Sequence, residues 1–164
     1  MLIINQNIQK LMNGYPTVSD KYNVAGAVLE GNTPVKFGQA VTFGSTNGYF
    51  KAITGALADA SKVAGFVLAT NVKLNTQWPE GGVDVLPGEA FNLLVNGFMA
   101  IELDDEATLA SATANSAVHV ILATGKMTTV DKFNQGTIVP LANVVFTGVT
   151  ETVGGKKLAE IYVK

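Results

Sequence analysis

The sequence has no cysteine, no arginine and a single histidine, His119. Without cysteine there can be no disulfide and no thiolate zinc site, and one histidine cannot supply a histidine pair for a metal. Without arginine the chain lacks the planar fork that binds phosphates and guanine edges through two hydrogen bonds. The lysines are scattered, with only Lys156 and Lys157 adjacent, so no basic stripe indicates a nucleic-acid partner.

Patterns of catalytic residues are missing as well. His119 lies in an apolar β-type run, which favours a structural role, and a hydroxyl nucleophile would need a base beside it. The segment around Gly125 fails as a phosphate-binding loop, because Val120 stands where that loop needs a glycine. The acidic cluster at residues 104–106 lacks the alternating spacing of a calcium loop and is better interpreted as a charged turn that caps a short helix. We therefore predict no enzyme activity, no cofactor and no metal.

Charge is scarce: 15% of the residues are charged, whereas 48% are hydrophobic. This balance indicates either many buried strands or a surface that other subunits cover. No apolar run reaches the roughly 18 residues of a membrane span, and the N-terminal residues lack the basic start and apolar run of a signal peptide. We expect no membrane partner and a protein that is made and kept in a cytoplasm.

The N-terminal residues differ in pattern from the rest of the chain. Their apolar residues recur at helical spacing and form a stripe that either docks on the chain's own core or lies on a neighbouring subunit. Asn13-Gly14 and Pro16 would end a helix there. We therefore divide the chain into an N-terminal arm over residues 1–16, either a short helix or extended, and a main domain over residues 17–164. The arm's candidate partner-interface residues are Ile3, Ile4, Ile8, Leu11, Met12 and Tyr15.

One further interface candidate, Trp78, lies in a polar stretch at residues 75–82. A tryptophan in such a loop is either an anchor for a sugar or protein partner, or a cover for one end of the domain.

From Val24 onward, short β-type runs alternate with Gly, Asn and Pro, which is typical of an antiparallel barrel or sandwich. Residues 45–48 have the composition of a hairpin turn. After the arm, helical signal is limited to residues 55–61 and 104–112. The sequence therefore predicts an all-β main domain.

Three segments share one skeleton, in which a turn-forming residue stands two positions before an alanine and a β run follows. The turn-forming residues are Gly38, Gly88 and Asn115. The second of these segments continues through Asn96-Gly97, which is either a two-residue hairpin turn or a bend with a bulge in one long strand. We favour the bent strand, because the apolar alternation that starts at Phe98 changes phase toward Ile101.

Four Gly- and Val-rich strand signatures follow one another at residues 34–44, 64–69, 88–101 and 115–129. In order and spacing they resemble the structural cement, or capsid decoration, proteins of tailed bacteriophages, and the resemblance extends from about residue 15 to residue 164. The chain departs from the family pattern at Asn115, where a glycine is usual. Its first dozen residues are also more helical in pattern than a family arm.

The resemblance implies a β-barrel-like or sandwich domain that binds the outside of an assembled phage head and bridges major capsid protein subunits. It implies two partners: the major capsid protein and further copies of the chain, a homotrimer before a homodimer. The protein would be made in the bacterial host cytoplasm and reside on the capsid exterior. The alternative function is a β-barrel module that binds a carbohydrate or a receptor in a tail or cell-surface assembly, which exposed aromatics around Trp78 would favour.

Overall fold

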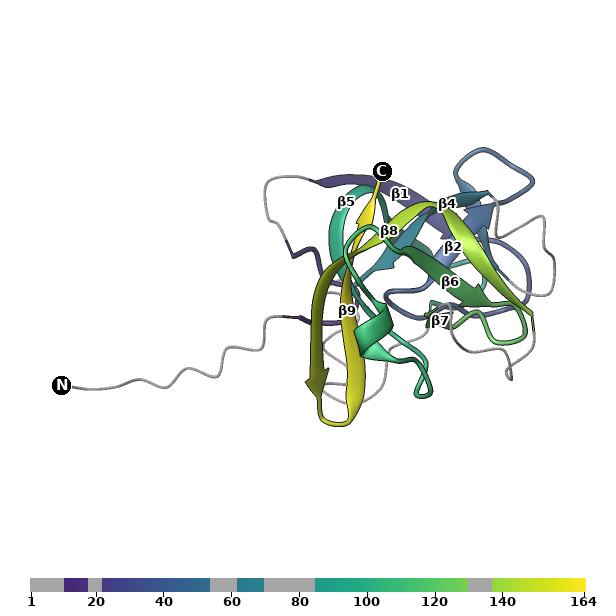
Figure 1. Ribbon diagram of the computed structural model, residues 1–164. Coiled ribbons are helices and arrows are strands. Elements are labelled where there is room, and N and C mark those ends of the chain that lie inside the picture. Colours follow the sequence, from purple (N-terminus) through teal and green to yellow (C-terminus); the bar gives the residue numbers. More distant parts are fainter. Residues whose placement is uncertain (1–10, 18–21, 54–61, 70–84, 130–136) are drawn as a thin grey trace.

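The computed structural model describes residues 11–17, 22–53, 62–69, 85–129 and 137–164, which are mostly β-strands (Figure 1). The strands are β1 (Tyr22–Leu29), β2 (Ala40–Phe43), β3 (Tyr49–Ala52), β4 (Val63–Leu68), β5 (Ala90–Glu102), β6 (Ala117–Ile121), β7 (Met127–Thr128), β8 (Ile138–Val153) and β9 (Lys156–Val163). Within the described residues, the one helical element is a 3₁₀ turn, η1 (Leu109–Ser111). The all-β prediction is confirmed. None of the helical structure in this part of the chain is long and apolar enough to cross a membrane.

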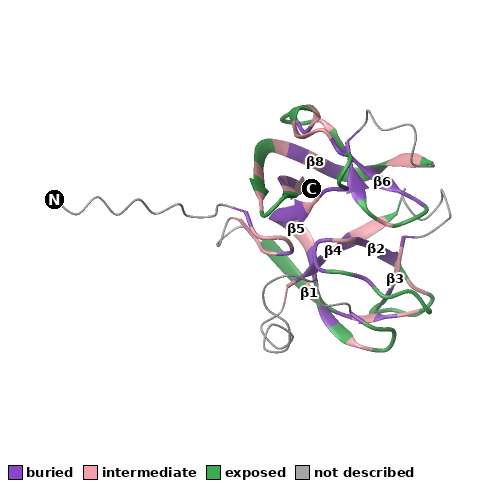
Figure 2. Cartoon of the chain, turned by 90° about the horizontal axis from the view of Figure 1, so that it is seen from below, coloured by how far each residue is buried: buried purple, intermediate pink, exposed green. Residues whose placement is uncertain are grey.

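The strands form one mixed, mostly antiparallel sheet in the order β1-β3-β2-β4-β5-β9-β8-β6-β7. Because β1 also pairs with β5, the first five strands close into a small ring, in which β1 and β3 are a parallel pair. The other four strands continue from the second half of β5, and β6 and β8 lie across from the ring (Figure 2). The architecture is thus a closed ring joined to an open sheet, and it is not a regular barrel.

β5 joins the two halves as a single strand. Its first half pairs with β1 and its second half pairs with β9, and no hairpin forms at Asn96-Gly97. The pairing with β1 skips one residue, Val95, and Gly97 has a φ of 125°. Leu94 and Met99 face the same core although they are five positions apart, and side chains an odd number of positions apart in a regular strand face opposite sides, so the strand must contain a one-residue bulge. The prediction of a bent strand is confirmed.

Two hydrophobic cores lie on either side of the shared strands. On β2, β4 and β5, successive residues alternate between the ring core and a larger core that lies between the ring and the open sheet. Val41, Val67 and Leu93 lie in the ring core, and their neighbours Ala40, Phe66 and Leu94 lie in the larger core. The described side chains of the ring therefore pack into a core of their own.

The three predicted strand starts have one geometry. Gly38, Gly88 and Asn115 all have positive φ, of 81°, 84° and 65°. In each case the next residue donates its N–H to the carbonyl three residues before it, as in a type II turn, and a strand begins at the following alanine. Asparagine tolerates this backbone conformation better than other non-glycine residues. This explains how Asn115 can stand where a glycine is usual.

The two turn predictions had different outcomes. The hairpin at residues 45–48 is confirmed, because it joins β2 to β3, with Phe43 opposite Phe50. The prediction of a capped helix over residues 104–112 is wrong, because only η1 forms and its N-cap residue is Thr108, whose side chain makes no capping hydrogen bond. The segment buries Ala107 and Ala112, whose separation of five residues does not match one face of an α-helix. The other predicted helix, over residues 55–61, lies outside the described residues.

Candidate partner interface

The described part of the N-terminal arm lies along the second half of β5 like a short added strand. Gly14 donates its N–H to the Ala100 carbonyl (2.9 Å), and Ala100 donates its N–H to the Tyr15 carbonyl (3.0 Å). Residues 11–13 are not helical, so the helix that the spacing allowed does not extend to them. This end of the arm is therefore part of the sheet.

Asn13 clamps the arm to two other segments. Its Nδ2 donates to the Phe37 carbonyl (2.9 Å), and its Oδ1 accepts the Glu102 N–H (2.9 Å). Gly14, with a φ of 79°, has no room for a side chain, because an added Cβ would stand 2.8 Å from the Cβ of Phe37. A Cβ on Gly38 would overlap the Asn13 Oδ1. In the sequence the Asn13-Gly14 pair was recognisable only as a helix stop. Its partners are distant in the chain, and no sequence pattern indicated that they contact it.

The structure places three of the predicted interface residues. Leu11 is 2% exposed, packs against Ala100 and Leu158, and donates its N–H to the Glu151 Oε2 (2.9 Å). It anchors the arm to the chain's own core. Met12 and Tyr15 are half-buried, and burial raises the pKa of Tyr15. The remaining interface candidates, Ile3, Ile4, Ile8 and Trp78, lie outside the described residues.

Five exposed apolar side chains form a second set of interface candidates. In the described residues they are Tyr22, Val24, Phe43, Tyr49 and Leu86, which are 39–61% exposed and lie on the ring strands or in the turn before β5, whereas a sixth exposed apolar residue, Val149 (41%), lies apart from them on β8. Phe43 and Tyr49 flank the β2–β3 hairpin, and Leu86 lies in the turn before β5. Sequence reasoning missed these residues, because alternation along a strand does not say which face a neighbouring element covers.

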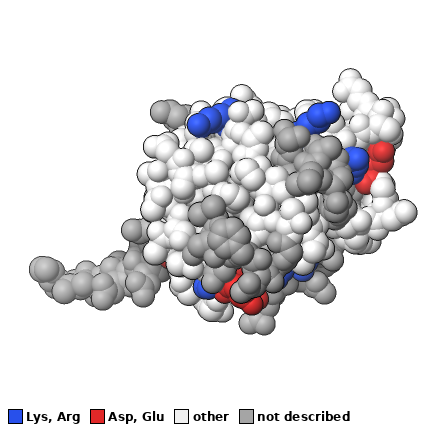
Figure 3. Space-filling model, turned by 45° about the vertical axis from the view of Figure 1, so that its right-hand side comes forward, with Lys and Arg blue, Asp and Glu red and all other residues white. Residues whose placement is uncertain are grey.

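Charged groups are sparse on one face of the molecule. In Figure 3 the lysine and acidic side chains lie near the margins of that face, in places with opposite charges side by side, and the described surface between them is largely uncharged. Uncharged, partly apolar surface of this kind is suited to burial against another protein.

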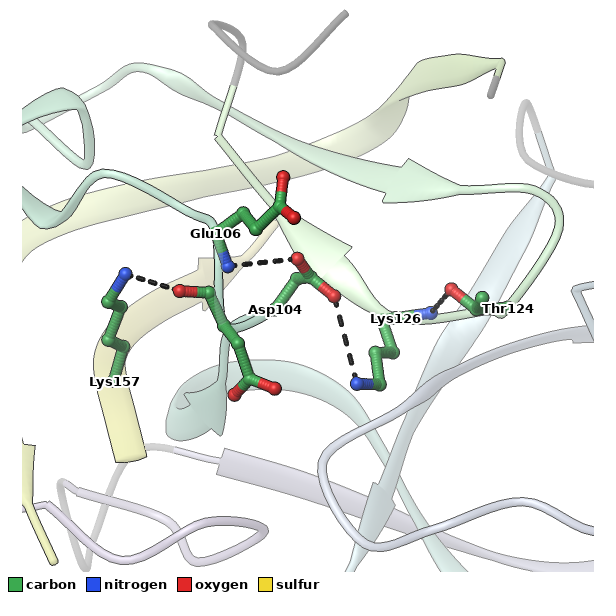
Figure 4. Close-up of polar contacts among 6 residues, drawn as sticks. Asp104, Glu106, Thr124, Lys126 and Lys157 are labelled. Carbon is green, nitrogen blue, oxygen red and sulfur yellow. Dashed lines mark hydrogen bonds and ion pairs between the residues drawn. The ribbon is translucent and has the colours of Figure 1, made fainter. Parts of the chain in front are cut away.

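The acidic turn binds its own neighbours (Figure 4). One oxygen of Asp104 accepts the Glu106 N–H (3.1 Å), and the other lies 3.7 Å from the Lys126 Nζ. Lys157 donates from its Nζ to the carbonyl of Asp105 and also to the carbonyl of Ala107. The charged turn is present, although it does not cap an α-helix as expected. No group of three metal-ligating side chains occurs in the described part of the chain.

Two other places hold side chains that could take part in chemistry. His119 is 9% exposed on β6, its Nδ1 lies 3.0 Å from the Ala117 carbonyl oxygen, and burial lowers its pKa. A groove of about 370 Å³ lies beside Asn13, but two of its lysines are close to acids: Lys156 is 3.0 Å from Glu102, and Lys126 faces Asp104. Neither place joins a nucleophile to a base.

Comparison with known proteins agrees with a structural role. Residues 4–164 match the family model described as "Structural cement protein (E217 gp24/Pam3 gp6)". No curated protein matches the chain. Among solved structures, a chain of "The capsid of Myoviridae Phage XM1" matches with a TM-score of 0.60 and 18% identity, over 96% of this chain and 93% of that one. At this identity the structural likeness shows a shared fold.

Proposed function

Because the chain belongs to the phage structural cement protein family, we propose that it binds the outer surface of a phage head and stabilises contacts between major capsid protein subunits. The observation that carries the proposal is the extent of the family match, residues 4–164, which leaves out only the first three residues of the chain. The chain is a structural, capsid-associated phage protein and not an enzyme, as its lack of catalytic groups predicted.

The exposed apolar side chains support the proposal physically. Burying one exposed large apolar side chain contributes roughly 1.5–3 kcal/mol, so a few such contacts offset the loss of freedom on association. Phe43 and Leu86, 61% and 51% exposed, are the described side chains with most to gain from a partner. We propose that the end of the ring that carries them, with Tyr49, contacts the capsid.

The arm supplies the second proposed contact. Leu11 and Asn13 fix the first described residues of the arm on the domain, with Leu11 beside Glu151 of β8. A short chain tethered at a fixed point meets a neighbour at high effective concentration, which strengthens binding without a large interface. We propose that Ile3, Ile4 and Ile8 contact another subunit, in a homotrimer first and a homodimer second.

A cement protein acts by bridging. When one molecule contacts two capsid subunits, separating them must also break the contacts of the bridging molecule, and many copies multiply this effect over a shell.

The rival function, a carbohydrate or receptor module, rested on aromatics around Trp78. The aromatic side chains that are exposed in the described residues are Tyr22, Phe43 and Tyr49, and they come from β1 and the β2–β3 hairpin.

The proposal is tested on expanded shells of the major capsid protein encoded with this chain. Shells with saturating protein should disrupt at a temperature several degrees higher than bare shells, as followed by calorimetry and electron microscopy. Phe43→Ser should lessen the gain, whereas Val149→Ser, a change of an apolar side chain on β8, serves as the matched control. Shells that bind the protein without any gain in stability would contradict the cementing role.

A further inference from the structure

We propose that the outer edge of β1 receives residues 1–10 of a second copy as an added β-strand. The inference rests on the proposed role of the arm in association, and it names the surface to which the arm binds. Strand addition of this kind supplies main-chain hydrogen bonds along an exposed sheet edge.

The backbone of β1 has a free side over its first part. Leu29 exchanges hydrogen bonds with the turn before β5, accepting from Gly88 (2.7 Å) and donating to Glu89 (3.0 Å), whereas Val28 donates to Gly48 on the opposite side (3.1 Å). Alternate residues of a strand direct both their N–H and C=O groups to the same side. The backbone groups of Gly26 and Val24 therefore point away from β5.

No described strand pairs with this side before Val28. The pairing of β1 with β3 involves only Val28 and Leu29, which leaves the strand from Tyr22 to Ala27 paired on the β5 side alone. Gly26 is exposed, and an added Cβ on it would meet nothing within 4 Å, so no described side chain packs over the face of the sheet at this point of β1.

The side chains of β1 do not protect this edge. Soluble proteins usually protect an open edge with lysine, proline or an inward-pointing charge. β1 reads YNVAGAVL and has neither a charged residue nor a proline, and Tyr22 and Val24 are 39% and 45% exposed. An edge with these properties is suited to an uncharged, apolar partner strand.

Residues 1–10 have the composition of such a partner. They read MLIINQNIQK, with three isoleucines, no proline, no glycine and one charge. Isoleucine is enriched in strands, and the absence of proline leaves every N–H available for pairing. The asparagine and glutamine side chains add no charge.

The length of the arm indicates that it comes from a second copy. Asn13 bonds to Glu102, whereas Val24 pairs with Leu94, eight residues back along β5, a path of about 27 Å. Ten extended residues span at most about 36 Å. A chain's own arm would be almost fully extended before it reached Val24, and it would have few residues left to pair with β1. The arm of a neighbour has no such limit.

Amide hydrogen exchange on the full-length protein tests the inference. At concentrations where the protein associates, the Val24 and Gly26 amides should be at least 10-fold more protected than in dilute, dissociated protein. The Ala25 and Ala27 amides, which face β5, should be protected to the same degree in both states. Equal exchange at Val24 and Gly26 in the two states would overturn the inference, as would a protein that stays monomeric at every concentration.

A pair of substitutions provides the second test. Val24→Lys should weaken association at least 10-fold by sedimentation, whereas Val149→Lys, a similarly exposed valine on β8 (41%), should change it less than twofold. Equal effects would overturn the inference. If Val24 and Gly26 become protected only on capsid shells, the added strand belongs to the capsid protein and the second-copy inference is wrong. Failure of the unmodified protein to bind capsid shells would instead contradict the proposed function.

Discussion

Two edges of the same sheet differ in how they are covered. The free side of the second half of β5 is covered by residues 14–17 of the chain itself, through hydrogen bonds to Phe98 and Ala100. The free side of β1 has no strand beside it in the described part of the molecule. The edge of β5 is covered by close contacts that tolerate few substitutions, whereas the edge of β1 leaves space for another strand. Substitutions at the first should therefore reduce stability, and substitutions at the second should reduce association.

The largest effect should separate two truncations. Removing residues 1–13 deletes the buried Leu11 and both hydrogen bonds of Asn13, so we expect a loss of about 4 kcal/mol in the free energy of unfolding. Removing residues 1–10 leaves these contacts in place and should change that free energy by less than about 0.5 kcal/mol. Urea unfolding measures both. Similar losses in the two variants would show that the covered edge does not depend on Leu11 and Asn13.

The second largest effect on stability should come from adding a single methyl group to a glycine at each edge. Gly14→Ala forces a side chain into a backbone with φ of 79° and toward the Cβ of Phe37, so we expect a loss of about 3 kcal/mol. Gly26→Ala places the same methyl group in open space on β1 and should change stability by less than about 1 kcal/mol. Thermal unfolding of the two variants measures the difference. A Gly14→Ala variant as stable as Gly26→Ala would break the comparison.

The smallest of these effects concerns the asparagine clamp. Asn13→Ala leaves the Phe37 carbonyl and the Glu102 N–H without their partner, which should lower stability by about 2 kcal/mol. The matched control is Asn23→Ala, an exposed asparagine on β1, with an expected change under about 0.5 kcal/mol. Chemical unfolding gives both values. Equal values would mean that Asn13 is clamped in position without contributing to stability.

The sequence predicted the local features of this fold well. The strand starts at Gly38, Gly88 and Asn115, the hairpin at residues 45–48 and the bend in β5 all follow from residues close together in the chain. Each depends on a turn conformation or on side-chain alternation, both of which leave a local pattern.

The features that the sequence did not predict depend on distant pairing. The ring closes because β1 pairs with β5, which lies more than 60 residues further along the chain. No residue pattern in either strand indicates that the other is its partner. The clamp at Asn13 likewise needs Phe37 and Glu102. The prediction of a short helix over residues 104–112 was wrong, because the surrounding sheet decides which residues of this segment are buried. The role of the arm could be proposed from its apolar residues, but its anchor at Leu11 could not.

Co-sedimentation with expanded capsid shells tests the central claim most directly. The full-length protein should pellet with the shells in a saturable manner, and the variant that lacks residues 1–10 should bind at least 10-fold more weakly while its circular dichroism and melting temperature stay unchanged. A full-length protein that remains in the supernatant at every concentration would contradict the account of a cement protein that binds the outside of the phage head.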